Sequence, residues 1–323
     1  MAYRLDPGAP LDAEFRRIAG EQIRKAEKGL GAGEGDRHAA VHDARKRMKK
    51  LRGLLRLVRD ARPAFHAKEN ARFRDAARKL SGARDSGALI EALDQLEAHY
   101  ADELATDAFG AVRRELTERR TNAEKAEMGP AVEQVLRSLG AARHKLDGFV
   151  IGRKSKAGDA ATIVASGIAR SYGRGRAALA TAQKTREVDA FHELRKRAKY
   201  HWMHLRLVGP LWPDAMKPLA EAGKQIGDSL GLDHDYAVLR EQIAATPDAF
   251  GTSGELAVVL ALADRRQTEL RESALDMARQ LFADDPDGVE TRIKRLYRAG
   301  AGRAARDPAA PASSPSDSRR RAG

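Results

Sequence analysis

One stretch of this chain occurs twice, at an offset of 150 residues. Residues 42–58 and 192–208 align without a gap, and nine of their seventeen positions are identical. Chance would give about one identity over this length, since each residue type makes up a few per cent to a tenth of an average protein. The sequence therefore predicts two copies of one structural unit.

Both copies have the periodicity of an amphipathic helix and contain no proline. Apolar residues recur every three or four positions along the first copy, at Val41, Ala44, Met48, Leu51, Leu55 and Val58. Basic residues follow one position later, at His42, Arg45, Lys49, Arg52, Arg56 and Arg59. This column of cations lies about 100° round the helix from the apolar face. The second copy repeats the column with His192, Arg195, Lys199 and Arg206.

A run of Lys and Arg often forms only a solvated helix face, and that interpretation applies to either copy taken alone. Two observations favour a bound polyanion instead. Residues 41–62 contain nine Lys and Arg but only two carboxylates, Asp43 and Asp60. Like charges four residues apart destabilise a helix by a few tenths of a kcal/mol per pair, yet the same spacing of cations is kept in both copies.

Composition narrows the possible partners. The chain carries 59 Lys and Arg against 46 Asp and Glu, a net charge of +13. This favours an acidic partner such as nucleic acid, an anionic membrane surface or a phosphate polymer. The absence of cysteine excludes disulfides and cysteine chemistry. Because no apolar run approaches the ~20 residues of a membrane span and the first residues lack a signal-peptide core, we expect a soluble, cytoplasmic protein without membrane contact.

The rest of the sequence indicates helices separated by Gly and Pro breaks, with no period-two alternation. The predicted fold is all-α, with two pseudo-symmetric bundles of about four principal helices each. We expect the first unit at residues 1–151 and the second at 152–300. Residues 301–323, rich in Ala, Pro, Ser and Arg, are predicted to form a disordered tail.

Several helix boundaries are predicted from proline, glycine and periodicity. Pro63 is expected to end the first basic helix, and the next helix is expected from about His66 to Leu80. A long helix is predicted over Ala101–Lys125 and a short last one over Val289–Arg298.

A second short pattern also repeats at the same offset. Residues 80–89 and 230–239 both indicate a helix end with Gly, a short turn, and an Asp that opens the next helix. Asp85 and Asp235 are then N-cap residues, or they orient a basic side chain of the site. Residues 233–235, Asp-His-Asp, suggest a metal, but three consecutive residues on a turn are a weak ligand set.

The doubled His-x-x-Arg-Lys-Arg-x-x-Lys pattern, followed each time by the Leu-turn-Asp element, resembles the CHAD family, named for its conserved histidine α-helical domain. The likeness extends over about residues 11–300. It implies two four-helix bundles with a basic groove or pore between them. It also implies binding of inorganic polyphosphate and, in some members, association with polyphosphate granules. Metal chelation by the histidines is an older proposal for the family.

The resemblance implies a set of polyphosphate-binding residues, namely His42, Arg45, Lys49, Arg52, Arg56, His192, Arg195, Lys199 and Arg206. Arg74 and Lys224 are added because they occupy equivalent positions in the two units. Arg47 and Arg197 match the motif but are expected on another face. Trp202 stands at the position of Arg52, so the two halves cannot contact an anion identically.

Two other histidines of the second copy are assigned from their positions. His201 falls at the core-facing position of Leu51 and is expected to be buried, whereas His204 is left undecided. We also expect the two basic helices to face each other across one groove. Binding is expected to tighten at lower pH, because bound phosphate favours the protonated form of His42 and His192.

The favoured function is non-catalytic binding of polyphosphate by a standalone domain, with no catalytic residue, metal or cofactor. The Glu-x-Glu-x-Lys signature of the triphosphate tunnel enzymes that share a chain with such domains is absent. Non-specific binding of nucleic acid is the first alternative, since phosphate contacts alone give affinity. A metal-binding or phosphoanhydride-cleaving enzyme that uses the histidines is the second, although the chain has no Walker loop and no His-Glu-x-x-His motif.

Overall fold

The computed structural model describes residues 3–32, 37–80, 85–104, 109–125, 129–151 and 159–306. Twelve α-helices and two 3-10 turns make up the regular structure of these ranges, which contain no β-strand. The helices of the first half are α1 (Leu11–Gly31), α2 (Arg37–Leu57), α3 (Pro63–Lys79), α4 (Asp85–His99), α5 (Gly110–Lys125) and α6 (Gly129–Asp147). Those of the second half are α7 (Ala160–Thr185), α8 (Val188–Val208), α9 (Pro213–Ala245), α10 (Pro247–Phe250), α11 (Ser253–Leu281) and α12 (Pro286–Arg306). The all-α prediction is confirmed for this part of the chain.

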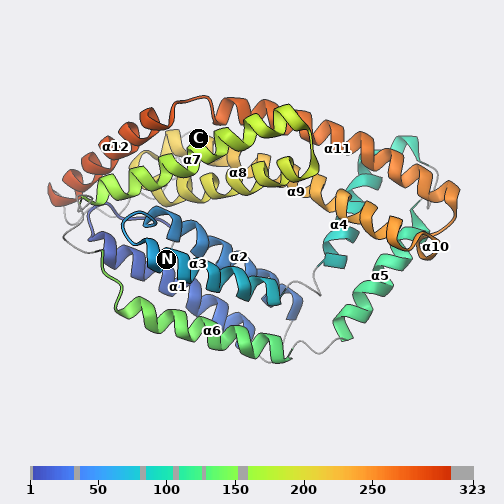
Figure 1. Ribbon diagram of the computed structural model, residues 1–323, viewed down its shortest axis with the longest axis horizontal. Coiled ribbons are helices and arrows are strands. Elements are labelled where there is room, and N and C mark those ends of the chain that lie inside the picture. The colour runs from blue at the N-terminus through green and yellow to red at the C-terminus, as the bar shows by residue number, and fades with distance from the viewer. Residues whose placement is uncertain are drawn as a thin grey trace, which may run out of the picture.

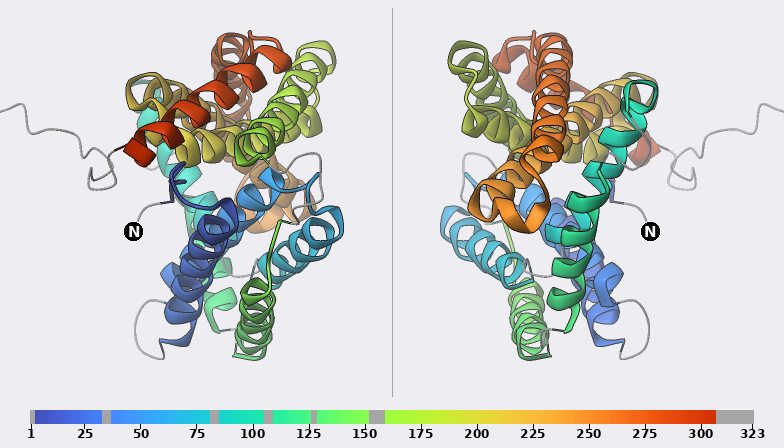
Figure 2. Two further views of the ribbon diagram at one scale, coloured as in Figure 1. Left: turned by 90° about the vertical axis from the view of Figure 1, so that its left-hand side faces the viewer. Right: turned by 90° about the vertical axis from the view of Figure 1, so that its right-hand side faces the viewer.

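The helices form two groups that lie one above the other (Figures 1 and 2). In the lower group α1 packs on α2 and α6, and α3 packs on α2 and α6. In the upper group α8 lies between α7 and α9, and α12 covers α7. Helix α2 also contacts α7 and α8, so one continuous apolar core extends through both groups.

A second apolar core occupies the other end of the molecule. Helices α4 and α5 leave the lower group (Figure 1). Helix α4 packs on α9 and α11, and α5 packs on α4 and α10. Fully buried Phe109, Tyr236 and Phe250 are the large side chains of this core. The long helices α9 and α11 therefore connect the two cores.

Several predicted boundaries are wrong. Pro63 is the first residue of α3, because proline is preorganised for that position. The helix predicted from Ala101 begins instead at Gly110, after a 3-10 turn at Ala101–Glu103 and an extended Leu104. The last helix, α12, extends beyond its predicted end to Arg306.

The turn predicted before Asp235 is absent, because α9 continues through Gly231 and Asp235 without a break. Asp235 is therefore not an N-cap. Gly231 serves close packing instead, since a Cβ there would lie 3.2 Å from the guanidinium of Arg195. Residues 81–84 lie outside the described ranges, so the N-cap role of Asp85 stays a prediction.

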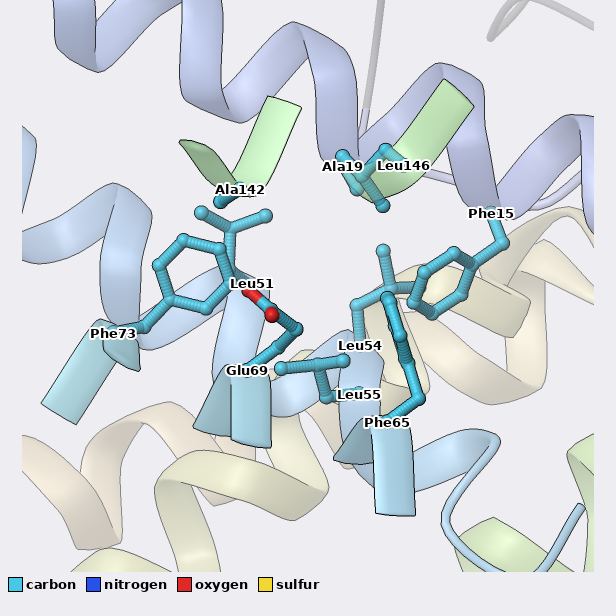
Figure 3. Close-up of a pocket in the computed structure, with 10 residues that line it drawn as sticks. All are labelled: Phe15, Ala19, Leu51, Leu54, Leu55, Phe65, Glu69, Phe73, Ala142 and Leu146. Carbon is cyan, nitrogen blue, oxygen red and sulfur yellow. The ribbon is translucent and has the colours of Figure 1, made fainter. Parts of the chain in front are cut away.

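A small cavity lies inside the lower group, between α1, α2, α3 and α6 (Figure 3). Its volume is about 10 Å³, and apolar side chains such as Phe15, Leu51 and Phe73 line it. The one carboxylate in its lining belongs to Glu69, which forms an ion pair of 2.8 Å with Arg72. A cavity of this size holds about one water molecule. This cavity is therefore too small for a ligand larger than water.

Candidate anion-binding site

The two basic helices, α2 and α8, cross where Gly53 meets Met203. A Cβ on Gly53 would lie 3.0 Å from the Met203 sulfur, so glycine permits this close approach. Beside the contact, Nε2 of the fully buried His204 lies 3.0 Å from the carbonyl oxygen of Gly53. Gly53 and Met203 occupy the same position in the two copies of the repeated stretch. The crossing brings cations of α2 next to side chains of α8.

Arg56 is the centre of the resulting site. Its guanidinium carbon lies 3.6 Å from the ring centroid of Tyr200 on α8, in cation–π geometry. Nη1 of Arg56 donates to the carbonyl oxygen of Arg52 at 2.6 Å and to Oδ1 of Asn70 at 3.4 Å. Nε of Arg52 donates to the same Asn70 oxygen at 3.1 Å. Asn70 of α3 and Tyr200 thus hold two arginines of the predicted column in fixed positions.

Further arginines converge on Arg56 from two other helices. Burial is the largest cause that lowers the pKa of Arg56 to about 10, and three neighbouring arginines add to the shift. These neighbours are Arg52 of α2, Arg174 of α7 and Arg197 of α8. The pKa of Arg174 is lowered in turn, first by burial and then by Arg59 and Arg197. We call Arg52, Arg56, Arg59, Arg174 and Arg197 the arginine cluster.

His66, in the first turn of α3, lies against this cluster. Burial and the charges of Arg56, Arg59 and Arg174 lower its pKa to about 4, so the imidazole is neutral at pH 7. Its buried Nε2 has no hydrogen-bond partner among the described residues. The charges of the arginine cluster therefore act on His66 as well as on one another.

Few carboxylates compensate the arginine cluster. Asp60 is engaged by Arg170 at 2.7 Å, and Glu193 pairs with Arg197. The other four arginines of the cluster form no ion pair with a carboxylate within the described ranges. Mutually repelling guanidinium groups held together in this way attract anions, above all those with several negative charges.

The first residues of the α2 column precede the arginine cluster along the helix. His42 and Lys49 are exposed, and Arg45 is half-buried. Nη1 of Arg45 donates to the carbonyl oxygen of Ala77 on α3 at 3.2 Å. The first column therefore runs along the side of α2 that borders α3.

The second column runs along the side of α8 that borders α9. The ring of His192 lies 4.5 Å from that of His234, and burial followed by this neighbour lowers the pKa of His192 to about 4. Lys199 passes over Gly227 and forms an ion pair of 2.6 Å with Asp228. Each column has its own neighbouring helix, and the single groove between them stays a prediction.

The remaining predicted binding residues, Lys224, Arg206 and Arg74, are not part of the arginine cluster. Lys224 shares Asp228 with Lys199, at 3.2 Å, so the two lysines and the carboxylate form one group. Arg206 is exposed and, with Lys199, flanks the ring of Trp202 at 5.3 and 5.4 Å from its centroid. The guanidinium of the exposed Arg74 is paired with the adjacent, half-buried Asp75 at 2.9 Å.

The sequence pattern alone did not identify Arg59, Arg174, His66 and Tyr200 as one site. Arg197 was expected on another face, yet it lies within the cluster. Its place depends on the crossing of α2 and α8, which helical periodicity does not predict.

Two further predictions concern the burial of His201 and a metal site at residues 233–235. His201 is buried as predicted and packs against Tyr172 and Phe282. The described ranges contain no group of three or more His, Asp and Glu that could hold a metal ion. Asp233 is instead buried in an ion pair of 2.7 Å with Arg271.

None of the helices in the described ranges has the length and apolarity needed to cross a bilayer.

Comparison with known proteins agrees with this architecture. The crystal structure of the CHAD domain from the plant Ricinus communis matches with a TM-score of 0.64 at 18% identity, over 88% of this chain and 95% of that chain. This likeness shows a shared fold. No curated protein matches the chain. The family profile described as the CHAD domain matches residues 17–244, well over half of the sequence, and the chain therefore belongs to the CHAD domain family.

Proposed function

We propose that the chain binds inorganic polyphosphate and does not cleave it. The observation that carries the proposal is the arginine cluster, in which four arginines, from α2, the turn that follows it and α7, have no carboxylate partner within the described ranges. Polyphosphate carries about one negative charge per phosphate along a flexible chain. Guanidinium groups bind such oxygens with charge-assisted hydrogen bonds, and released counterions add to the affinity.

We further propose that the two halves are pseudo-symmetric four-helix units, at residues 1–151 and 152–300, with a basic groove or pore between them. The contacts at the α2–α8 crossing support this arrangement. Gly53 meets its own counterpart, Met203, as a two-fold axis at that point requires. Arg56 lies on Tyr200, and the counterparts of these two residues, Arg206 and Lys50, are also neighbours.

The aromatic rings of the second basic helix, Tyr200 and Trp202, argue against binding of single-stranded nucleic acid at the two columns. Such binding usually uses free aromatic faces, each worth about 1–3 kcal/mol per stacked base. Arg56 covers Tyr200, and Lys199 and Arg206 flank Trp202. A polymer of phosphates without bases suits this surface better. Duplex DNA, which offers phosphates alone, and cleavage of phosphoanhydrides are the alternatives to be tested. The proposal includes a cytoplasmic location, with association with polyphosphate granules.

The cluster is tested by a matched pair of charge changes. Arg174→Gln removes an exposed cation of the cluster, whereas Arg279→Gln removes an exposed cation of α11 that pairs with Asp276. We expect Arg174→Gln to weaken binding of long-chain polyphosphate about tenfold, as for loss of a hydrogen bond to a charged group. Arg279→Gln is expected to change it less than twofold. Affinity is measured by fluorescence polarisation at near-physiological salt.

Folding of each variant is verified by circular dichroism. The two variants have equal net charge, one unit below that of the wild type. Equal loss of affinity in the two variants would mean that only the overall charge of the protein matters. Arg56→Gln provides a second variant at the centre of the cluster, with a larger expected loss. Wild-type affinity in both cluster variants would contradict the proposed site.

A further inference from the structure

Two lysines of the second half share one carboxylate. Nζ of Lys199, on α8, lies 2.6 Å from Oδ1 of Asp228, on α9. Nζ of Lys224, one turn earlier on α9, lies 3.2 Å from Oδ2 of the same residue. Lys224 also pairs with Glu221, at the longer distance of 3.7 Å. Each oxygen of the Asp228 carboxylate therefore binds one of two ammonium groups that come from different helices.

The surface of α9 accommodates this contact at a glycine. The Lys199 side chain crosses Gly227, the residue before Asp228, where an added Cβ would lie 2.6 Å from both Cδ and Cε of the lysine. Nζ of Lys199 also lies 5.4 Å from the ring centroid of Trp202. Glycine thus lets the lysine stem lie across α9 and brings its ammonium group to Asp228.

The first half has the opposite charge at the position of this carboxylate. At the offset of 150 residues, Lys199 corresponds to a lysine and Lys224 to an arginine, whereas Asp228 corresponds to Arg78. The repeated pair of helices therefore does not require a carboxylate at this position. The acidic residue is a property of the second half alone.

The Asp228 carboxylate is ionised at neutral pH. Burial raises its pKa, but the hydrogen bonds and charges of Lys199 and Lys224 outweigh burial, so the pKa lies below its ordinary value. The hydrogen bond with Asp228 is also the first cause that raises the pKa of Lys224. A phosphate group accepts the same charge-assisted hydrogen bonds from ammonium groups as a carboxylate does. Asp228 thus holds the two lysines as a bound phosphate would.

We propose that Asp228 is an internal competitor for polyphosphate in the second column. Its carboxylate occupies the position of one phosphate between Lys199 and Lys224, and a polyphosphate chain binds the two lysines only by displacing it. The exchange of one anion for another adds little to the affinity. This inference rests on the proposed polyphosphate binding and names the residue that limits its strength.

The test compares two changes that each remove one negative charge. Asp228→Asn removes the competitor, whereas Asp276→Asn removes an exposed carboxylate of α11 that pairs with Arg279. Affinity for long-chain polyphosphate is measured by fluorescence polarisation, and folding is verified by circular dichroism. We expect Asp228→Asn to bind about fivefold more tightly than wild type, as for loss of a partly exposed ion pair and of one nearby repulsive charge. Asp276→Asn is expected to change the affinity less than about twofold.

The salt dependence gives a second measurement, which general stabilisation of the protein would not change. Without Asp228, the two lysines neutralise one more phosphate charge when the chain binds. The slope of log affinity against log salt concentration is therefore expected to steepen by about 0.7 in Asp228→Asn. It is expected to keep its wild-type value in Asp276→Asn.

A third variant changes the geometry and leaves the net charge unchanged. In Gly227→Ala the added methyl group moves the Lys199 stem away from α9 and weakens its pair with Asp228. The affinity is expected to rise about twofold, as for partial loss of an ion pair. Gly29→Ala is the matched control, because nothing lies within 4 Å of its added Cβ, and it is expected to bind as wild type does.

Three results would contradict the competitor. If Asp228→Asn binds no more tightly than Asp276→Asn, or keeps the salt slope of the wild type, this inference alone is overturned. A Gly227→Ala variant with wild-type affinity would also overturn it, since the position of Lys199 would then have no effect. Wild-type protein without affinity for polyphosphate would overturn both the proposed function and this inference.

Discussion

Four histidine side chains lie in surroundings that disfavour their protonated form. His201 and His204 are buried in the core, and burial lowers their pKa to about 3 and about 4, respectively. Burial and neighbouring cations act on His66 and His192, each with a pKa of about 4. The folded chain therefore binds fewer protons than the unfolded chain over the range between these values and the ordinary pKa of 6.5.

This difference predicts a loss of stability in mild acid. The unfolded chain takes up the protons first as pH falls below about 6.5, so the free energy of unfolding decreases down to about pH 4. For the fully buried His204 the contribution is on the order of 3 kcal/mol. His204→Gln, which can still donate to Gly53, is expected to lose less stability than wild type between pH 7.5 and pH 5, measured by urea unfolding. The exposed His144→Gln is expected to behave as wild type. An unchanged pH dependence in His204→Gln would contradict this account.

At the scale of helices, the two halves are joined by close backbone contacts at glycine. Gly167 of α7 packs on Leu57, near the end of α2. A Cβ at Gly167 would lie 2.6 Å from both Cα and the carbonyl oxygen of Leu57. Backbone atoms cannot move aside as a flexible side chain can, so this contact requires glycine.

Gly167→Ala is therefore expected to destabilise the protein by about 1–3 kcal/mol, as overpacked core substitutions do. Gly29→Ala on α1 is the matched control, because nothing lies within 4 Å of its added Cβ. It is expected to be neutral or to stabilise by up to about 1 kcal/mol, since alanine favours helix. Both are measured by thermal and urea unfolding. Similar stability of the two variants would contradict the close α2–α7 contact.

Local sequence patterns predicted some features of the helices correctly and others wrongly. Periodicity predicted the basic helices and the apolar face that contains Met48 and Leu51, because both properties are local. It failed at Gly231, where glycine was interpreted as a turn. Glycine there accommodates the Arg195 side chain of a neighbouring helix, and that requirement arises only in the packed structure.

At the scale of the whole molecule, the site arises from the way the helices cross. The sequence predicted Arg52 and Arg56 from the basic column on α2. It did not predict that Arg174 and Arg197 would join them, because these residues come from helices whose positions depend on tertiary packing. The second column is different, since Asp228 compensates Lys199 and Lys224 there. The second column is therefore less positive than the arginine cluster, which combines arginines from both halves of the chain.

The central claim is that this surface binds polyphosphate selectively and without cleavage. The most direct test titrates the purified protein with long-chain polyphosphate, in competition with duplex and single-stranded DNA at matched phosphate equivalents and near-physiological salt. Released phosphate is measured in the same samples. The account predicts tight binding that DNA displaces poorly, with no phosphate released. Equal competition by DNA would mean a general polyanion surface, and release of phosphate would mean an enzyme; either result would contradict the account.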